Sequence, residues 1–311
     1  MKRIYDEGLK ATVILDDNGQ LRAIKPVDTY PELAGYGQSD AIGYLSRIAD
    51  LLGLPADAFR DAQQAVSYNM PRKQDQLYRL SEEKAFFDST TYAYYQTCLN
   101  VPVWASGITI TVSHDPARVV SVTNTSQGGI DVELPAAKDI NRYRQILSGG
   151  EKIDDTPEKN GVRQSKTASD RASRRIEEIL GVATSDSKSR IGRKGSPKLI
   201  RGRFFVYRYD PEKRISDFPK EKTDDHSHDK KQESEHSCCG TPPTLPLKAV
   251  AKTIQDDHWY LAAELVFRLP HEGDPMNWRM LVDVRTDTIL YLRALTSGIS
   301  GSVFIYDPIT S

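Results

Sequence analysis

The stretch TYAYYQTCLNVPVWASGITITVSH, residues 91–114, predicts two strands joined by a short polar corner. Val101 and Val103 place apolar side chains at odd positions, whereas from Ile108 onward the apolar side chains fall at even positions. Because the side chains of a strand alternate between its two faces, this phase must slip in between. We therefore predict a β-bulge at Gly107.

Two further features around this stretch follow from the same pattern analysis. Residues 10–26 contain two short apolar runs separated by Asn18-Gly19, a pair that supplies the positive φ angles of a tight hairpin turn. Apolar residues recur at helical spacing over 41–52, which predicts one amphipathic helix. The tetrapeptide HDPA then turns the chain into another strand over 118–124.

The second half of the chain predicts one helix and a second group of strands. The helix covers 169–181, where an apolar stripe ends at a terminating glycine. Apolar residues alternate with others over 201–210, 259–269 and 278–284, which predicts long, half-buried antiparallel strands.

Two segments are too polar to bury much surface. Residues 136–164 are predicted to form a polar connector, and residues of about 211–246 a flexible insertion, because few apolar groups offset the entropy of ordering them. The insertion contains side chains that soft metals bind, but their spacing matches no common zinc motif, which favours a solvated loop. These low-ranking metal candidates are His226, His228, His236, Cys238 and Cys239.

The composition excludes several classes of function. The chain has 311 residues with 42 basic and 43 acidic side chains, so its net charge of −1 gives no general attraction to nucleic acid or anionic lipid. No apolar run is long enough to cross a bilayer, and the opening residues lack the apolar core of a signal peptide. We expect a soluble protein, and its location stays open.

No catalytic motif emerges from the sequence. A thermolysin-like zinc site needs two histidines one helical turn apart with a glutamate between them, and His271-Glu272 lacks a second histidine at that spacing. Glycine-rich phosphate loops and a nucleophile elbow are also missing. We therefore predict neither an enzyme nor a cofactor-binding protein.

The opening stretch nevertheless resembles a known signature. Its order of aromatic strand, glutamine, short turn, Pro-Val pair and return strand is similar to that of the fungalysin/thermolysin propeptide (FTP) family. Tyr94, Gln96, Pro102 and Val103 stand in those places. Residues 165–294 resemble the PepSY module that follows in such prosegments, with Asp283 in the place of its strand-end aspartate.

The resemblance implies an α+β fold of two cystatin- or PepSY-like units, each with a helix packed on a twisted antiparallel sheet. The first, FTP-like unit would cover residues 1–135. The connector 136–164 would follow, and then a PepSY-like unit over 165–311 that contains the insertion at about 211–246.

The same resemblance implies a noncatalytic prosegment that helps a thermolysin-like zinc metalloprotease to fold and then inhibits it. The partner would be such a protease domain or copies of this chain, in an extracellular setting. The alternative is a structural or assembly subunit, self-assembling or at the cell surface, that keeps the fold without a protease. Within this hypothesis Gln96 and Pro102 shape an irregular sheet edge, Trp104 faces a partner, and Asp283 holds its turn.

Overall fold

The computed structural model describes residues 1–7, 9–27, 30–148, 166–181, 196–215, 245, 247–271 and 276–295. The protein is a mixed α/β structure in which the strands are mostly antiparallel and the helices are few. The chain divides into two compact units, which are described separately. Among the described residues, the first unit comprises Met1–Leu134 with Phe204–Tyr207, and the second comprises the described parts of Pro135–Arg203 and Arg208–Ser297.

Seven strands of the first unit form an antiparallel sheet in the order β4-β5-β6-β7-β3-β2-β1. On β6, Val103 also pairs in parallel with Val206. The strands are β1 Lys2–Asp6, β2 Ala11–Leu15, β3 Leu21–Pro26, β4 Leu77–Ala85, β5 Ser89–Cys98, β6 Val101–Ser113 and β7 Arg118–Asn124.

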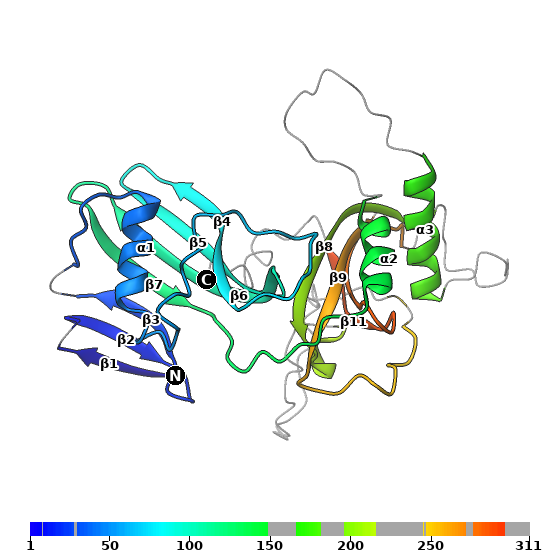
Figure 1. Ribbon diagram of the computed structural model, residues 1–311, viewed down its shortest axis with the longest axis horizontal. Helices are drawn as coiled ribbons and strands as arrows, with labels where there is room; N and C mark the ends of the chain where they lie inside the picture. The colour runs from blue at the N-terminus through cyan, green and yellow to red at the C-terminus, as the bar shows by residue number, and fades with distance from the viewer. Residues whose placement is uncertain are drawn as a thin grey trace, which may run out of the picture. The chain divides into compact units, whose positions relative to one another are not determined.

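The helix of the first unit, α1, covers Gln38–Arg47 and shares one hydrophobic core with the strands (Figure 1). Asp40 accepts a hydrogen bond from the backbone N–H of Gly37, which caps the first turn. The predicted helix was placed over 41–52, so the real one begins and ends earlier. The buried residues Ile48 and Leu52 follow it in a turn and still belong to the core.

Both predicted hairpins of this unit are confirmed. β2 and β3 pair around Gly19, whose φ of +78° suits a glycine. β6 and β7 pair on either side of His114–Ala117. The corner between β5 and β6 is a two-residue loop, in which Leu99 and Asn100 both have positive φ, as in a type I′ turn.

The predicted irregularity of β6 is present, but its geometry differs from the expectation. Tyr95 lies opposite Gly107, and Thr97 lies opposite Pro102, so four residues of β6 face the single residue Gln96 of β5. The residue with positive φ is Ala105, at 51°. Gly107 is needed for another reason, because a Cβ there would collide with the carbonyl oxygen of Tyr94.

In the described part of the second unit, the helices α2 Ala137–Leu147 and α3 Lys166–Leu180 lie side by side (Figure 1). The prediction of a polar connector over 136–164 is therefore wrong for 137–147. Few apolar residues mark α2, but they recur at helical spacing and are buried: Ile140, Tyr143 and Ile146. Helix α3 confirms the predicted helix over 169–181 and ends before Gly181, which has a φ of +72°.

The strands of the second group follow the order β8-β9-β10-β11, with antiparallel pairing of β10 to both neighbours. They are β8 Lys198–Arg208, β9 Trp259–Arg268, β10 Asn277–Asp283 and β11 Ile289–Leu295, and a 3-10 turn covers Pro211–Lys213. The prediction of half-buried strands is wrong for β9, where every residue from Leu261 to Phe267 is buried. Both faces of this strand are thus covered.

Several predictions fall on residues outside the described ranges. They include most of the insertion at 211–246 and all five metal candidates, His226, His228, His236, Cys238 and Cys239. Residues after Leu295 also lie outside.

Candidate functional site

Gln96 lies on β5, opposite the bulge of β6. Its side chain lies in the interior, with 3% of the residue exposed. Its amide oxygen accepts hydrogen bonds from the hydroxyl of Ser106 and from the backbone N–H of Gln127, the latter at 2.9 Å. Its amide nitrogen donates to the backbone carbonyl of Gln127 at 2.9 Å. One neutral side chain therefore joins β5, the bulge of β6 and the segment after β7.

The other residues of the resemblance lie in or beside the core of the first unit. Tyr94 is 1% exposed, and burial raises the pKa of its phenol. Val103 is fully buried, and Pro102 is buried opposite Thr97. Trp104 is half-buried and packs edge-on against Phe205, with ring centroids 5.1 Å apart. Their positions stabilise the sheet.

Aromatic side chains that the sequence analysis did not single out protrude from the tip of the β4–β5 hairpin. Phe86 is 56% exposed, and Phe87 is fully exposed at 104%. The tip itself is well ordered by hydrogen bonds, since Phe86 N–H donates to the carbonyl of Ser89 at 2.7 Å. Two phenylalanines are thus held in water on a short, structured turn.

The neighbouring β6–β7 hairpin reaches the same end of the sheet. His114 donates its backbone N–H to the carbonyl of Asp88 at 2.9 Å, which joins the two tips. The ring of His114 packs on Tyr36 with centroids 4.5 Å apart, and Tyr36 is half exposed. We name Phe86, Phe87, Tyr36 and His114 the aromatic tip.

Two acidic side chains lie in the turns that carry the aromatic tip. Asp88 and Asp115, one in each hairpin turn, are exposed. The nearby cation Lys84 is paired with Glu82 at 3.4 Å. The tip therefore combines an apolar centre with negative charge, and it suits a partner that offers an apolar pocket near basic groups.

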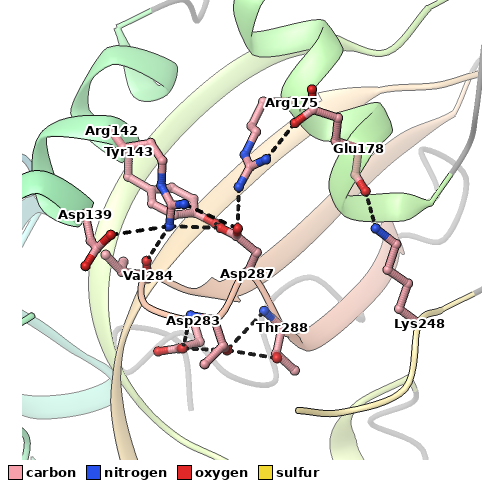
Figure 2. A network of polar contacts seen from close by, with 11 residues as sticks. Asp139, Arg142, Tyr143, Arg175, Glu178, Lys248, Asp283, Val284, Asp287 and Thr288 are labelled. Carbon is pink, nitrogen blue, oxygen red and sulfur yellow. Dashed lines mark hydrogen bonds and ion pairs between the residues drawn. The ribbon is translucent and has the colours of Figure 1, made fainter.

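A second polar arrangement connects the helices of the second unit to the β10–β11 turn (Figure 2). Asp287, with a φ of 58°, accepts hydrogen bonds from Tyr143 of α2 at 2.7 Å and from Arg175 of α3. Arg142 of α2 forms an ion pair with the same carboxylate at 3.2 Å and donates to the carbonyl of Val284 at 2.9 Å. One carboxylate thus ties both helices to the turn.

Burial and these partners shift two pKa values. Burial raises the pKa of the Tyr143 phenol well above its ordinary value, and the neighbouring Asp287 carboxylate adds to this effect. Burial alone would lower the pKa of Arg175, but its hydrogen bonds to Glu178 and Asp287 raise it. Both groups therefore keep their protons at neutral pH, as the network requires.

Asp283, at the end of β10, is 2% exposed. Its carboxylate accepts hydrogen bonds from the backbone N–H of Thr286 at 2.8 Å and from its hydroxyl at 2.7 Å. Burial raises the pKa of Asp283, although the bonds from Thr286 oppose the shift. These contacts hold the turn that presents Asp287.

A cavity of about 360 Å³ lies beside this network and is lined by residues of α3, the β10–β11 turn and 248–251. Its charged walls are already engaged with one another: Arg175 contacts both Glu178 and Asp287, while Lys248 donates to the carbonyl of Glu178 at the end of α3. These contacts stabilise the helix terminus.

A cysteine–histidine dyad in the first unit is excluded by position. Cys98 ends β5, whereas His114 lies beside the start of β5, where its ring contacts Thr90 at 2.9 Å. Ten residues of extended strand separate these ends, about 30 Å. Burial also raises the pKa of the Cys98 thiol, which disfavours the reactive thiolate.

The described ranges contain neither a metal-binding cluster nor a membrane-spanning helix. In that part of the chain no group of three or more His, Cys, Asp or Glu side chains is placed to hold a metal ion. None of the helices seen there has the length and apolar character needed to span a membrane.

The sequence analysis missed the aromatic tip and most of the Asp287 network. The tip had a signal, because two phenylalanines stand in AFFDS, between two strands and outside their alternation. Asp287 has a positive φ of 58°, a conformation that aspartate tolerates in a turn. Its partners on α2 had no signal, since that helix was not predicted.

Comparisons with known proteins identify no family. No family model matches the chain, and no curated protein matches it. Among solved structures, the C-terminal domain of YpeB from Bacillus megaterium aligns with 95% of this chain and 89% of its own, at 8% identity and a TM-score of 0.26.

Proposed function

We propose that the chain is a noncatalytic protein-binding module that acts as a folding chaperone and inhibitor of a thermolysin-like zinc metalloprotease. The observation that carries the proposal is the aromatic tip, with Phe87 fully exposed and Phe86 more than half exposed on a hydrogen-bonded turn. Large exposed apolar groups on an ordered surface are typical of protein-binding sites.

The construction of the tip favours tight binding. Its backbone is fixed by bonds from Phe86 to Ser89 and from His114 to Asp88, so little backbone freedom remains to be lost on binding. Phenylalanine has only two side-chain torsions, which keeps the cost of immobilising it low. Burial of such a side chain contributes about 1.5–3 kcal/mol, so two of them suffice for the centre of an interface.

The resemblance to FTP and PepSY prosegments supplies the finer part of the proposal, namely two cystatin- or PepSY-like units and a protease as partner. The shared core of α1 and the first sheet, and the ties from α2 and α3 to the β10–β11 turn, support such units. A surface that binds only the native protease stabilises it, by about 2.7 kcal/mol when the free module is at 100 times its Kd. The same occupancy accounts for inhibition.

The test is an inhibition assay with thermolysin and a short chromogenic peptide substrate. We expect micromolar chain to slow hydrolysis, and the double variant Phe86→Ser/Phe87→Ser to weaken inhibition at least about tenfold, since each anchor is worth over 1.4 kcal/mol. Leu51→Ser/Met70→Ser is the matched control, because these side chains are about half exposed on the same unit.

Each result has a distinct meaning. If the native chain does not slow thermolysin at all, the protease-inhibitor proposal is wrong. If it inhibits and the Phe86/Phe87 variant inhibits equally, the module function stands but the aromatic tip is not its contact. Gel analysis of the same mixtures excludes simple competition by a digested chain.

A further inference from the structure

The strand β1 has the properties of an open sheet edge. It is the terminal strand of the first unit's sheet, and within the described ranges only β2 pairs with it. Every residue from Lys2 to Tyr5 is exposed, and within the described ranges no strand pairs with the outer side of β1. Exposed edges of this kind present unpaired backbone groups that another strand can bind.

The sequence of β1, KRIYD, is complementary to itself when two copies run antiparallel. Pairing centred on Ile4 places Lys2 directly opposite Asp6 of the second copy, and Ile4 opposite its own copy. The two-fold axis produces the Lys2–Asp6 ion pair twice. We propose that two copies of this chain associate by antiparallel pairing of their β1 strands, which joins the two sheets edge to edge.

The face of the sheet on which these pairs lie supports the pairing. Ile4 lies opposite Val13 of β2, and Val13 belongs to the hydrophobic core. Ile4 therefore extends the apolar face of the sheet to its open edge, where 36% of the residue is exposed. A second copy would cover Ile4 with another Ile4 and continue the same face.

The charges of Lys2 and Asp6 favour a second copy of this chain over an unrelated strand as the partner of β1. The neighbours of Lys2 and Asp6 on β2 are Leu15 and Ala11, which are apolar. The described residues give Lys2 no ion-pair partner, and Asp6 uses one oxygen to accept from Leu9 N–H at 2.9 Å. On the opposite face, Arg3 would stand across from an aromatic Tyr5 ring of the copy.

The interface is small, which sets the expected strength. Five residues a side fall in the size class of weak, transient contacts, so we expect a dissociation constant between about 10 µM and 1 mM. This association is independent of the proposed protease binding, because the aromatic tip is formed by other strands. The two proposals therefore fail separately.

Sedimentation velocity over that concentration range tests the inference with the full chain. We expect the native chain to shift from monomer to dimer as its concentration rises. In a dimer of Lys2→Glu two acidic side chains would face each other at positions 2 and 6, and in a dimer of Asp6→Lys two basic side chains would do so. Because like charges repel, each variant alone is expected to remain monomeric. An equimolar mixture of the two restores opposite charges and is expected to dimerise as the native chain does.

Two further variants complete the design. Lys73→Glu makes the same charge change at an exposed position away from β1 and is expected to dimerise normally. Ile4→Lys leaves the Asp6 turn bond intact, places two cations across the axis and is expected to abolish the dimer; it replaces Asp6→Lys if that variant does not fold. A native chain that is monomeric at about 1 mM, or variants that dimerise like the native chain, overturn the proposal.

Discussion

The bulge of β6 in the first unit and the β10–β11 turn in the second are both irregular, but they are held by different chemistry. Each contains a residue other than glycine with positive φ, Ala105 at 51° in the bulge and Asp287 at 58° in the turn. In the first, the uncharged amide of Gln96 connects the neighbouring segments. In the second, the charged carboxylate of Asp287 does so.

The difference in burial explains the difference in chemistry. Gln96 is 3% exposed, and an unpaired charge would be costly there. A neutral amide both donates and accepts, so it can bind the Ser106 hydroxyl and the backbone N–H and carbonyl of Gln127. The Asp287 side chain is 28% exposed and has two arginines nearby, so its charge stays partly solvated and paired. The stability contributed by the Gln96 contacts should therefore not depend on salt concentration, whereas the stability contributed by the Asp287 contacts should.

The largest effect is expected for Gln96→Leu. The substitution leaves the Ser106 hydroxyl and both backbone groups of Gln127 without their partner in the interior. At about 1–3 kcal/mol for each buried unsatisfied group, with some relaxation, we expect a loss of about 3 kcal/mol in the free energy of unfolding. Urea denaturation of the full chain, followed by tryptophan fluorescence, measures it.

Gln76→Leu is the matched control, because Gln76 is exposed and shares one weak bond with Gln96 at 3.3 Å. We expect it to change stability by less than about 0.5 kcal/mol. Equal losses for the two variants, or a strong salt dependence of the Gln96→Leu loss, would contradict the assignment of Gln96 as a buried neutral anchor.

The bulge of β6 also shows how far the sequence determines the fold. The phase slip between Val103 and Ile108 predicts the irregularity, because alternation of side chains is a property of any strand. It does not say which residue takes the positive φ, and that residue is Ala105. The conformation of the bulge depends on contacts with the neighbouring strand. One such contact is the close approach of Gly107 to the carbonyl of Tyr94.

The second unit was less predictable for a related reason. Helix α2 has only three buried apolar residues, and its remaining attachment is polar, through Arg142 and Tyr143 to a turn more than 140 residues away. No local pattern encodes such a contact. The aromatic tip differs, because the pair Phe86-Phe87 is visible in the sequence, but its exposure follows only once the ends of β4 and β5 are known.

The next largest effect is expected for Asp287→Asn, which keeps a residue that tolerates positive φ but removes the charge. Arg142 and Arg175 lose their shared anion, and we expect a loss of about 1–2 kcal/mol, less than for a fully buried pair because all three side chains are partly exposed. Urea denaturation at low and at high salt measures it, and high salt should shrink the loss.

Asp57→Asn provides the comparison for a surface pair. Asp57 contacts Arg60 at 2.7 Å, but about half of each side chain is exposed, so we expect a change of less than about 0.5 kcal/mol. If Asp287→Asn is as mild as Asp57→Asn, or if its cost does not depend on salt, the charged network does not fasten the helices to the turn.

The smallest effect concerns Asp283, which shares the β10–β11 turn with Asp287 but lies in the interior. Burial raises the pKa of Asp283 above 3.8 in the folded state, so the folded protein binds this proton more tightly than the unfolded chain does. Its contribution to stability is therefore present below pH 3.8 and is lost as the pH rises through the raised pKa. Asp283→Asn removes this titration while its amide oxygen can still accept from Thr286.

The measurement is the free energy of unfolding of the native chain minus that of Asp283→Asn, followed upward in pH from about 3.5. We expect this difference to fall. Asp210→Asn is expected to give the opposite slope: burial raises the pKa of Asp210, but hydrogen bonds from Lys213 and the Glu212 backbone outweigh it and lower the pKa. The two aspartates would then show opposite pH dependence of this difference. Burial determines the pKa shift of Asp283, whereas hydrogen bonds determine that of Asp210. A rising difference for Asp283 would mean that Thr286 stabilises the ionised carboxylate more than burial destabilises it, and Asp283 would then resemble Asp287, whose charge is stabilised by its partners.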